Sequence, residues 1–559
     1  MRAVIIAVAL LCADTGALAL QFERAETQSL EVTISRVQDR DAISVKMAFD
    51  GDPSGQTTLR FTNWAELPGR GNHVDKLTAH GVLDKLYVDR EADGEWSIRH
   101  RRNEPLVITY EVPENTRQAS NNNRDHHRPI YNESLLHAVG HVFLALPQHL
   151  GDNVELTLAW DGFGDWMTLT SLGSLDKTVT MTTSTQDLYG ALFVAGPLRI
   201  EERYVNGNPI YISLHGEHWD FTLEELADNV ATIAQVERDY FDDHAFPFYW
   251  VSAIAVGEAL ESGYSYAGTR LHNSFALFLN PSTRFESSEL TGSPIMRLLA
   301  HEMMHVWFGG KLLPSLEADE GTYFWFSEGF TDYFTNLVML ESGLLTDLQY
   351  VNVVNDVFRD YYYNPQRDAP NQAIPGNFYQ SMNYRELPYQ RGKLIALALE
   401  LGIVTRSLKD IMADWLRDDS WSEGFTLDDF LDALDPELSD SQLEALTDAI
   451  EQGGDIDWSL FNDGHCLEVF ETDVFPWEVG FDYITSFETA TVSGVIRGSA
   501  AYWAGLRNGQ ELLAWSLKYD NIDEPVKLRV AEIDEEIEFF ARGTPARMPQ
   551  VRLRAPDCL

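Results

Sequence analysis

The sequence predicts a multidomain α+β protein, and its length and two changes of pattern along the chain carry that prediction. At 559 residues the chain exceeds what one hydrophobic core usually supports. Short alternating apolar runs dominate its first part, and helical periodicity dominates its middle. We therefore expect a leader at residues 1–19, a β domain at 20–205, an α+β domain with a helical part at 206–455 and a small β domain at 472–545.

The first residues contain the three parts of a secretory signal peptide. A positive start at Met1-Arg2 precedes an apolar run from Ala3 to Ala13, and Ala17-Leu18-Ala19 provides a small-x-small cleavage site. This run is too short to span a bilayer, and no later apolar stretch approaches about 20 residues. We expect export to the periplasm or the medium. Lipid attachment at Cys12 is a weaker alternative, because the preceding leucine is too large for a usual lipoprotein signal.

The β domain is predicted from alternation of apolar and polar residues. Runs such as Leu30 to Ile34 and Val154 to Leu158 alternate with a period of two and are separated by Gly, Pro and Asn. A chain of such runs favours a β-sandwich or a saddle-shaped sheet.

The pattern changes after Gly207. Apolar residues at helical spacing then predict a helix from Leu223 to Phe241, and from Pro294 to about Ile450 the helical period dominates. The strands expected here are Ile210 to Leu214, Phe248 to Val256 and Phe275 to Leu279. A small sheet packed against helices follows from this order.

The charge of the chain limits its possible partners, and its cysteines allow one disulfide. The chain carries 41 Lys and Arg against 87 Asp and Glu, a formal net charge of -46, so nucleic acid and anionic membranes are poor partners. The acidic residues are spread along the chain, which indicates a solubilising surface. Removal of the leader leaves Cys466 and Cys558, which form either a disulfide or two free thiols.

One segment has the ligand spacing of a zinc site. Between Ser293-Pro294, which starts a helix, and Gly309-Gly310, which ends it, the residues His301 and His305 lie four apart. They therefore share one helix face and can present two nitrogens to a single ion, while Glu302 leans over its open position. Two neutral imidazoles suit zinc, with a buried structural histidine pair as the alternative.

A catalytic zinc ion needs a third protein ligand and an open position for water. Glu328 supplies that ligand from a second amphipathic helix, expected from Thr322 to Gly343. Asp332, one turn later, either accepts a hydrogen bond from a ligand histidine or is a surface carboxylate.

These residues together predict hydrolysis of a peptide bond. Glu302 would act as general base for the attacking water and return the proton to the leaving amine. A second donor must stabilise the oxyanion, and Tyr389 is our first candidate, with Tyr384 as the second.

At these residues the sequence resembles the gluzincins, and within them the glycyl aminopeptidase family. The motifs that carry the resemblance are His301-Glu302-Met303-Met304-His305, Trp325-Phe326-Ser327-Glu328-Gly329-Phe330-Thr331, Tyr389-Gln390-Arg391-Gly392 and Ser407-Leu408-Lys409-Asp410-Ile411-Met412. The resemblance implies an N-terminal β domain, a thermolysin-like catalytic domain and a C-terminal PDZ domain, the last at Gly494 to Ala501 and Ala504 to Gly509. It also implies that Tyr389 stabilises the transition state.

The chain departs from that family where the substrate amino group would bind. The family has a Gly-rich stretch ending in Glu-His before the substrate strand, and Leu271 stands here in place of the Glu. Glu258 or Glu261 could substitute for it. We still expect His272, Asn273 and Ser274 to contact substrate, and the strand from Ser274 to Leu279 to pair with a peptide backbone.

Three functions remain open on these residues. The first is a zinc aminopeptidase, and the second is an exported zinc endopeptidase that needs no free N-terminus, which Leu271 favours. The third is a non-catalytic peptide-binding protein with a PDZ module. The PDZ-like segment itself either captures a peptide terminus or shapes access to the cleft, and we prefer the second role because Gly480-Phe481 only weakly resembles a carboxylate-binding loop.

Overall fold

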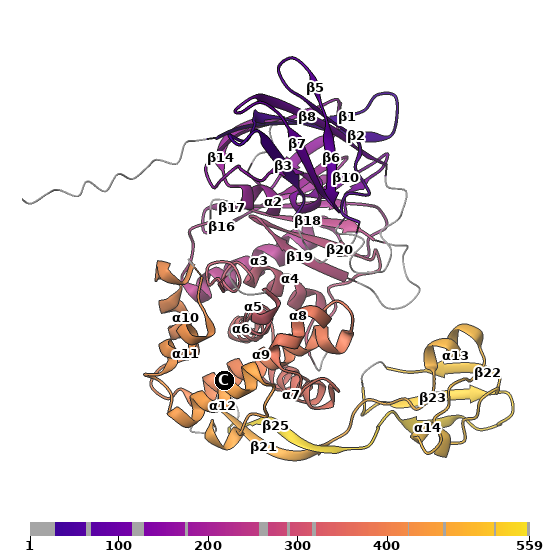
Figure 1. The fold of residues 1–559 in the computed structure, drawn as a ribbon. Helices are drawn as coiled ribbons and strands as arrows, with labels where there is room; N and C mark the ends of the chain where they lie inside the picture. The colour runs from indigo at the N-terminus through magenta and orange to yellow at the C-terminus, as the bar shows by residue number, and fades with distance from the viewer. Residues whose placement is uncertain are drawn as a thin grey trace, which may run out of the picture. The chain divides into compact units, whose positions relative to one another are not determined.

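The computed structural model describes residues 28–62, 67, 69–114, 128–173, 177–246, 248–256, 266–287, 291–315, 320–422, 424–461, 466–518 and 521–555. These residues form two compact units, one from 28 to 195 and the other from 196 to 555 (Figure 1). The predicted leader, Glu258, Glu261 and Cys558 lie outside the described residues.

The first unit is built from β-strands, as the alternating pattern predicts. Its strands are β1 (Gln28–Arg36), β2 (Ala42–Asp50), β3 (Gln56–Arg60), β4 (Asp75–His80), β5 (Lys85–Leu86), β6 (Val88–Ala92), β7 (Glu95–Arg99), β8 (Pro105–Pro113), β9 (Ile130–Tyr131), β10 (Leu136–Val139), β11 (Leu146–Pro147), β12 (Val154–Asp161), β13 (Met167–Thr170), β14 (Thr178–Thr183) and β15 (Leu192–Gly196). Two short helices, α1 (Gly140–Phe143) and α2 (Thr185–Gly190), connect them.

Seven of these strands form one sheet in the order β14-β12-β1-β2-β8-β4-β5. The runs at Leu30 and Val154 that predict strands are direct neighbours here, because β1 and β12 pair in parallel with Leu30 opposite Leu156. Leu30, Val32 and Ile34 of β1 are buried in an apolar core that also contains Tyr110 and Phe193. The apolar residues at every second position of the sequence therefore form the inward face of this sheet.

The second unit begins with a five-stranded sheet in the order β16-β17-β18-β20-β19. Its strands are β16 (Arg199–Val205), β17 (Asn208–His215), β18 (Tyr249–Ala255), β19 (Tyr266–Leu271) and β20 (Ser274–Leu279). Because β16 pairs with β17, the division lies after Ala195 and not after residue 205. Helices α3 (Leu223–Phe241) and α4 (Pro294–Met304) cover one face of the sheet through a shared apolar core (Figure 1).

A helical part follows the sheet. Its elements are η2 (Glu320–Tyr323), α5 (Phe324–Ser327), α6 (Gly329–Glu341), α7 (Asp347–Tyr363), η3 (Asn371–Ala373), α8 (Ile374–Asn377), α9 (Met382–Gly402), α10 (Leu408–Trp415), η4 (Asp419–Ser422), α11 (Leu427–Leu434), α12 (Asp440–Glu451) and η5 (Trp458–Leu460). Thr346, Ser407 and Thr426 each form a capping box at the start of a helix, which fixes where those helices begin. None of the described helices is long and apolar enough to cross a membrane.

The two helices that carry the predicted metal ligands are shorter than expected. α4 ends at Met304, because Val306 and Trp307 bond to carbonyls three residues back and the chain then turns at Gly309, whose φ is +80°. The helix expected from Thr322 to Gly343 is broken into η2, α5 and α6, with Glu328 between α5 and α6.

A contact between two glycines accompanies that break. A Cβ on Gly392 of α9 would lie 1.8 Å from the Trp325 carbonyl oxygen, and one on Gly329 would lie 2.4 Å from the Gly392 Cα. Only glycine permits the two helix backbones to approach this closely. The contact brings α9 directly against the segment that carries Glu328.

The chain ends in a ribbon that carries a small domain. Strands β21 (Leu467–Val474) and β25 (Ala546–Leu553) pair antiparallel over their whole length and pack on α7, where Asn355 bonds to the Val551 main chain. Cys466, just before the ribbon, is disulfide-bonded. Between the two strands lie a three-stranded antiparallel sheet and two short helices: β22 (Leu512–Ser516), β23 (Pro525–Val530), β24 (Ile537–Phe540), α13 (Tyr483–Thr489) and α14 (Ala500–Trp503).

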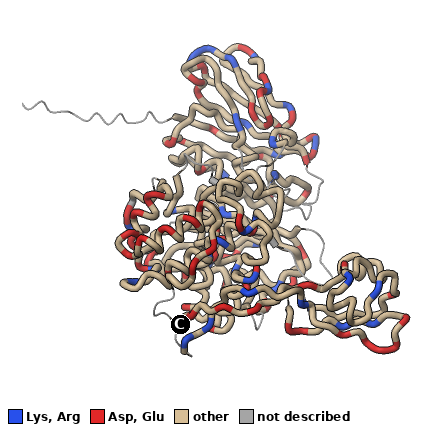
Figure 2. The backbone as a smooth tube through the Cα atoms, turned by 60° about the horizontal axis from the view of Figure 1, so that its bottom comes forward, with Lys and Arg blue, Asp and Glu red and all other residues tan. Residues whose placement is uncertain are grey.

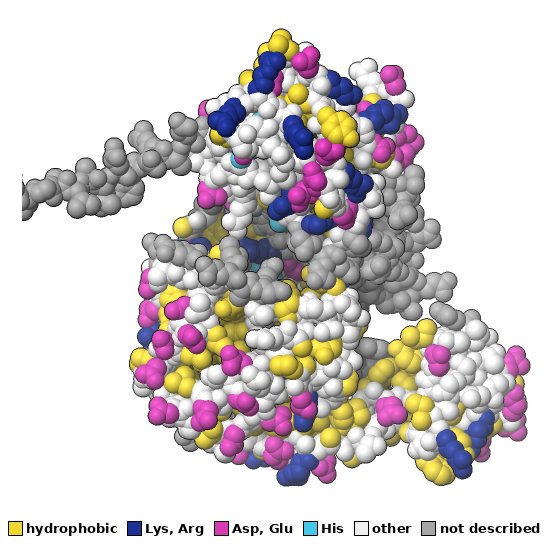
Figure 3. All heavy atoms as spheres, in the orientation of Figure 1, with side chains coloured by type: hydrophobic (Ala, Val, Ile, Leu, Met, Phe, Trp, Pro, Cys, Tyr) yellow, Lys and Arg dark blue, Asp and Glu magenta, His cyan; other side chains and the backbone are white. Residues whose placement is uncertain are grey.

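Asp and Glu residues occur along the backbone of both units and are not confined to one segment (Figure 2). On the face drawn in Figure 3 acidic side chains are dotted among uncharged and apolar ones over the helical part, while Lys and Arg are frequent on the first unit. This distribution agrees with a solubilising acidic surface.

Replacing Gly392 by Ala should destabilise the protein by about 2 kcal/mol or more, because the new methyl group meets backbone that cannot rotate away. The measurement is urea unfolding of the variant and the parent. Gly376→Ala is the matched control, since nothing lies within 4 Å of a Cβ at that helical glycine. Equal unfolding midpoints for both variants would show that the glycine contact is dispensable.

Candidate metal centre and active site

Three predicted ligands converge at the end of α4. His301 lies on its last turn, His305 is the residue that caps its end, and Glu328 lies between α5 and α6. The two Nε2 atoms are 3.1 Å apart, and the Glu328 Oε2 is 3.3 Å from the first and 3.4 Å from the second. A tetrahedral zinc ion with bonds of about 2.1 Å holds its ligand atoms about 3.3 Å apart. The three atoms therefore fit three corners of a zinc tetrahedron.

Hydrogen bonds on the far side of each ring set the tautomer that zinc needs. His301 Nδ1 lies 2.7 Å from Asp332 Oδ1, and His305 Nδ1 lies 3.2 Å from the Phe308 carbonyl oxygen. Because carboxylate and carbonyl oxygens accept, both Nδ1 atoms carry the proton and both Nε2 atoms keep a lone pair for the metal. Asp332 thus has the supporting position predicted for it.

Lys393 holds Asp332 from the other side. Its Nζ lies 2.8 Å from Asp332 Oδ2. Burial alone would raise the pKa of Asp332, but the Lys393 ammonium and His301 outweigh that effect and hold the pKa well below its usual range. Asp332 therefore stays ionised and keeps its hydrogen bond to His301.

The charge of the site also calls for a cation. Glu302, Glu328 and Asp332 are three carboxylates with limited solvent access, and Lys393 offers one ammonium. With neutral imidazoles the group keeps two negative charges, which are costly to hold away from water. A divalent ion bound by the histidines and Glu328 balances them.

Glu302 lies between the ligand helix and strand β19. A Cβ on Gly268 would lie 2.5 Å from the Glu302 Oε1, so the absence of a side chain there makes room for this carboxylate. Burial raises the pKa of Glu302, and a hydrogen bond from the Arg270 backbone lowers it in part. Glu302 therefore has the position and the increased basicity of a general base.

Tyr389 on α9 lies at the same site, and its role in catalysis stays a prediction. Its ring is stacked on His301 at 6.0 Å between centroids, and its hydroxyl interacts with Glu328. Burial, with Glu328 and Asp332 nearby, raises the pKa of Tyr389 well above its usual value, so the phenol stays a hydrogen-bond donor. Tyr384, the second candidate, packs against the helical core.

The strand that faces the site is β19 and not β20. β20 pairs with β18 on one side and with β19 on the other, so the expectation that Ser274 to Leu279 binds a peptide by edge pairing is wrong. Leu271 and Ser274 close a two-residue turn and bond to each other, which leaves the main-chain groups of Gly268 and Arg270 on the open edge.

The predicted substrate residues lie at that turn. Ser274 is fully buried and donates to the His272 carbonyl, whereas Asn273 takes a left-handed backbone and its side chain contacts the His272 ring. Their contact with substrate stays a prediction. Leu271 is buried and points to the face opposite Gly268, so the exposed residue beside Glu302 on this strand is Arg270.

Sequence reasoning missed Lys393 and Gly268. Lys393 follows Tyr389 by four residues, so the two share one face of α9, and that spacing is a signal available in the sequence. Gly268 gives no such signal, because its role depends on the carboxylate that packs over it.

Replacing Lys393 by Met should weaken zinc binding by about 10-fold to 100-fold, because Asp332 then loses the partner that holds it against His301. The measurement is the zinc Kd from competition with a chelator. Lys409→Met is the control, since Lys409 is also paired with a carboxylate, Glu341, away from the site. An unchanged zinc Kd in the Lys393 variant would contradict this role.

Comparison with known proteins finds zinc aminopeptidases among the proteins that this chain is similar to. The model of the M61 glycyl aminopeptidase family matches residues 294–374. An aminopeptidase N from Plutella xylostella is 28% identical over 128 residues, which is 22% of this chain and only 13% of that protein.

Solved structures extend the likeness to the whole fold. A crystal structure of an aminopeptidase N family protein from Idiomarina loihiensis has a TM-score of 0.67 at 18% identity, over 95% of this chain and 99% of that chain. An M1 zinc metallopeptidase from Deinococcus radiodurans has a TM-score of 0.51 at 14% identity, over 77% and 94%. The matched segment, the fold and the His-His-Glu cluster make this chain similar to zinc metallopeptidases of the glycyl aminopeptidase and aminopeptidase N families.

Proposed function

We propose that the protein is a zinc-dependent aminopeptidase that hydrolyses the first peptide bond of its substrates. One observation carries the proposal: the His301, His305 and Glu328 donor atoms meet at zinc-ligand spacing with Glu302 and Tyr389 beside them. The similarity of the 294–374 segment to the glycyl aminopeptidase model supports the amino-terminal preference.

The side chains divide the reaction between them. His301, His305 and Glu328 would hold a zinc ion, which would supply Lewis-acid chemistry for the scissile carbonyl and the attacking water. Glu302 takes the proton of the attacking water and later gives it to the leaving amine, which its raised pKa favours. Tyr389 donates its hydroxyl proton in a hydrogen bond to the oxyanion.

The open edge of β19 is suited to position the substrate. The outward main-chain groups of Gly268 and Arg270 can pair with an extended peptide beside Glu302. Such pairing uses only main-chain atoms, so it orients the scissile bond without fixing the side-chain preference.

An endopeptidase is the second candidate, and residues on β19 favour it. In the family the position near the substrate strand is a Glu that anchors the free amine, whereas this chain has the buried Leu271 and the exposed Arg270. A guanidinium repels an ammonium group, so a substrate without a free amine would fit this edge better.

We further propose that the enzyme acts outside the cytoplasm and that residues 472–545 form a PDZ-like domain that shapes access to the cleft. The disulfide at Cys466 supports an oxidising compartment. The small sheet and short helices between β21 and β25 are compatible with a PDZ-like domain.

Glu302→Gln should keep zinc and lose about 10²-fold to 10⁴-fold in kcat, because an amide cannot accept the proton of water. Zinc content and hydrolysis of amino-acid amides are measured on the same preparation. Glu341→Gln, a carboxylate on α6 that pairs with Lys409, is the control and should keep full activity. Retained turnover in the Glu302 variant would rule out this mechanism.

Tyr389→Phe should lower kcat by about 10²-fold to 10³-fold with little change in KM, because the lost hydroxyl acts only on the oxyanion. Tyr384→Phe is the natural comparison, since it removes the same atom from the same helix. If Tyr384→Phe is the damaged variant and Tyr389→Phe is not, the two roles must be exchanged.

Peptides with a free amino terminus should be cleaved at least about tenfold faster, in kcat/KM, than the same peptides after acetylation, because the amine contributes binding energy. Product analysis by mass spectrometry gives the cleavage position. Equal kcat/KM values for the free and the acetylated peptides would contradict the aminopeptidase proposal and support the endopeptidase.

A further inference from the structure

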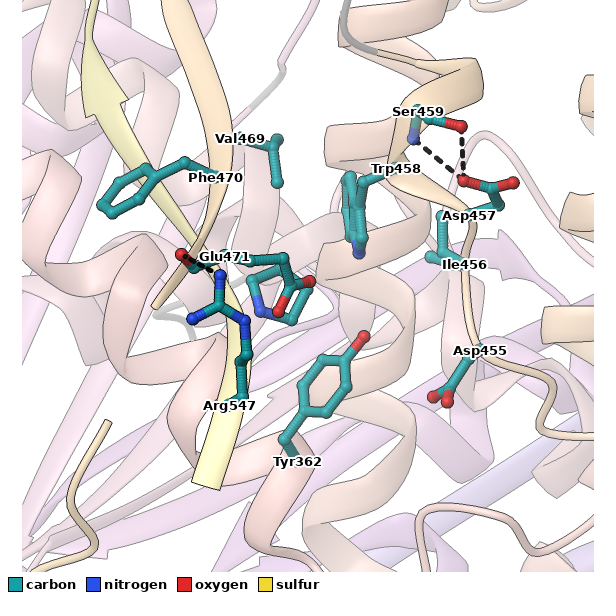
Figure 4. A pocket seen from close by; sticks show the side chains of 11 residues that line it. Tyr362, Asp455, Ile456, Asp457, Trp458, Ser459, Val469, Phe470, Glu471 and Arg547 are labelled. Carbon is teal, nitrogen blue, oxygen red and sulfur yellow. Dashed lines mark hydrogen bonds between the residues drawn. The ribbon is translucent and has the colours of Figure 1, made fainter. Parts of the chain in front are cut away.

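A cavity of about 460 Å³ lies apart from the metal centre, at the base of the ribbon. Its walls come from the end of α7, from the loop around η5 and from both ribbon strands, as Figure 4 shows. The residues that line it are Tyr362, Asp455, Ile456, Asp457, Trp458, Ser459, Val469, Phe470, Glu471, Arg547 and Pro549. This volume lies within the range of pockets that bind small ligands.

The apolar side of the cavity is held in place by the core. Trp458 is 8% exposed and packs edge-on against Phe358 at 5.0 Å between ring centroids. The loop beside it is fixed by Asp457, whose Oδ1 accepts from the Ser459 backbone at 3.0 Å and from its hydroxyl at 2.6 Å. The cavity therefore has a preformed aromatic wall.

Opposite charges face this cavity without contacting each other. The Glu471 carboxylate and the Arg547 guanidinium form no ion pair with each other or with any other described residue. Arg547 uses one nitrogen, Nη2, to donate to the Glu471 carbonyl oxygen at 3.3 Å, and its other donors remain for a ligand. In Figure 4 the Tyr362 hydroxyl and the Glu471 carboxylate point into the same space.

The remaining charges make one end of the cavity favourable to a cation. Asp455 adds a second carboxylate, held only by a long contact of 3.7 Å with Arg367. Burial raises the pKa of Tyr362, so its phenol stays protonated and its hydroxyl adds a polar group to this end, while the Arg367 guanidinium lies over its ring at 5.0 Å. Carboxylates beside aromatic faces are a setting that binds ammonium groups.

We propose that this cavity binds a free amino acid or a short peptide as a zwitterion, with the ammonium at Glu471 and Tyr362 and the carboxylate at Arg547. The apolar side chain of the ligand lies against Trp458, Ile456 and Pro549. Glu471 and Arg547 form no ion pair with each other, and a zwitterion offers an ammonium to the first and a carboxylate to the second. The binding is independent of the proposed function, and only the identity of the ligand as a reaction product rests on that function.

The test is calorimetric titration of the full-length, zinc-loaded Glu302→Gln variant with L-leucine, while a peptide hydroxamate saturates the metal centre. One ligand should bind per chain, with a Kd of about 1 mM. N-acetyl-L-leucine and L-leucinamide each lack one of the two charges, so each should bind about fivefold more weakly. Because this variant does not depend on turnover, a failed aminopeptidase assay leaves the test valid.

Glu471→Gln and Arg547→Gln should each weaken leucine binding by about fivefold. Both residues are exposed, so neither change threatens folding. Glu468→Gln is the matched control, because Glu468 is on the same strand but pairs with Arg552 outside the cavity, and its leucine Kd should stay unchanged. No heat of binding, or equal Kd values in all three variants, would overturn the proposal.

Discussion

The close approach of Gly329 and Gly392 is the contact on which the arrangement of the candidate active site depends. At this point α9 lies against the junction of α5 and α6, so that residues spaced by four on each helix meet in pairs. Tyr389 meets Glu328, and Lys393 meets Asp332. A larger residue at the crossing would separate the oxyanion donor and the support of His301 from the metal ligands together. A change at this helix crossing would therefore affect zinc binding and catalysis together.

Electrostatics makes the same group of residues dependent on a metal ion. Three carboxylates and one ammonium with little access to solvent favour a further positive charge at this site. Asp332 is held ionised by Lys393, and this in turn keeps the His301 lone pair directed at the ion. The fold thus holds these carboxylates in place before a metal ion binds, and the bound ion would neutralise their remaining negative charge.

Much of this was predictable from the sequence, because it depends on local spacing. The helix from Leu223 to Phe241 has the predicted bounds, and His301, His305 and Glu328 converge as expected. What the sequence could not give are contacts between distant segments. The order of strands places β19 at the edge, and the segment around the break at Glu328 contacts a glycine far along the chain. Lys393 differs from these, because its spacing of four from Tyr389 on α9 is visible in the sequence, and only its contact with Asp332 needs the structure.

The ribbon has a consequence for how the second unit is assembled. Val474 and Ala546 are opposite each other at its end, so everything between them is an insertion into a hairpin whose second strand packs on α7. Tyr363 fixes both sides of that junction, with its hydroxyl between the main chains of Val474 and Ala546. During synthesis α7 can pack against β25 only after the whole insert has emerged from the ribosome. The helical core is therefore completed from its carboxyl end, and the inserted domain has time to fold before the hairpin closes.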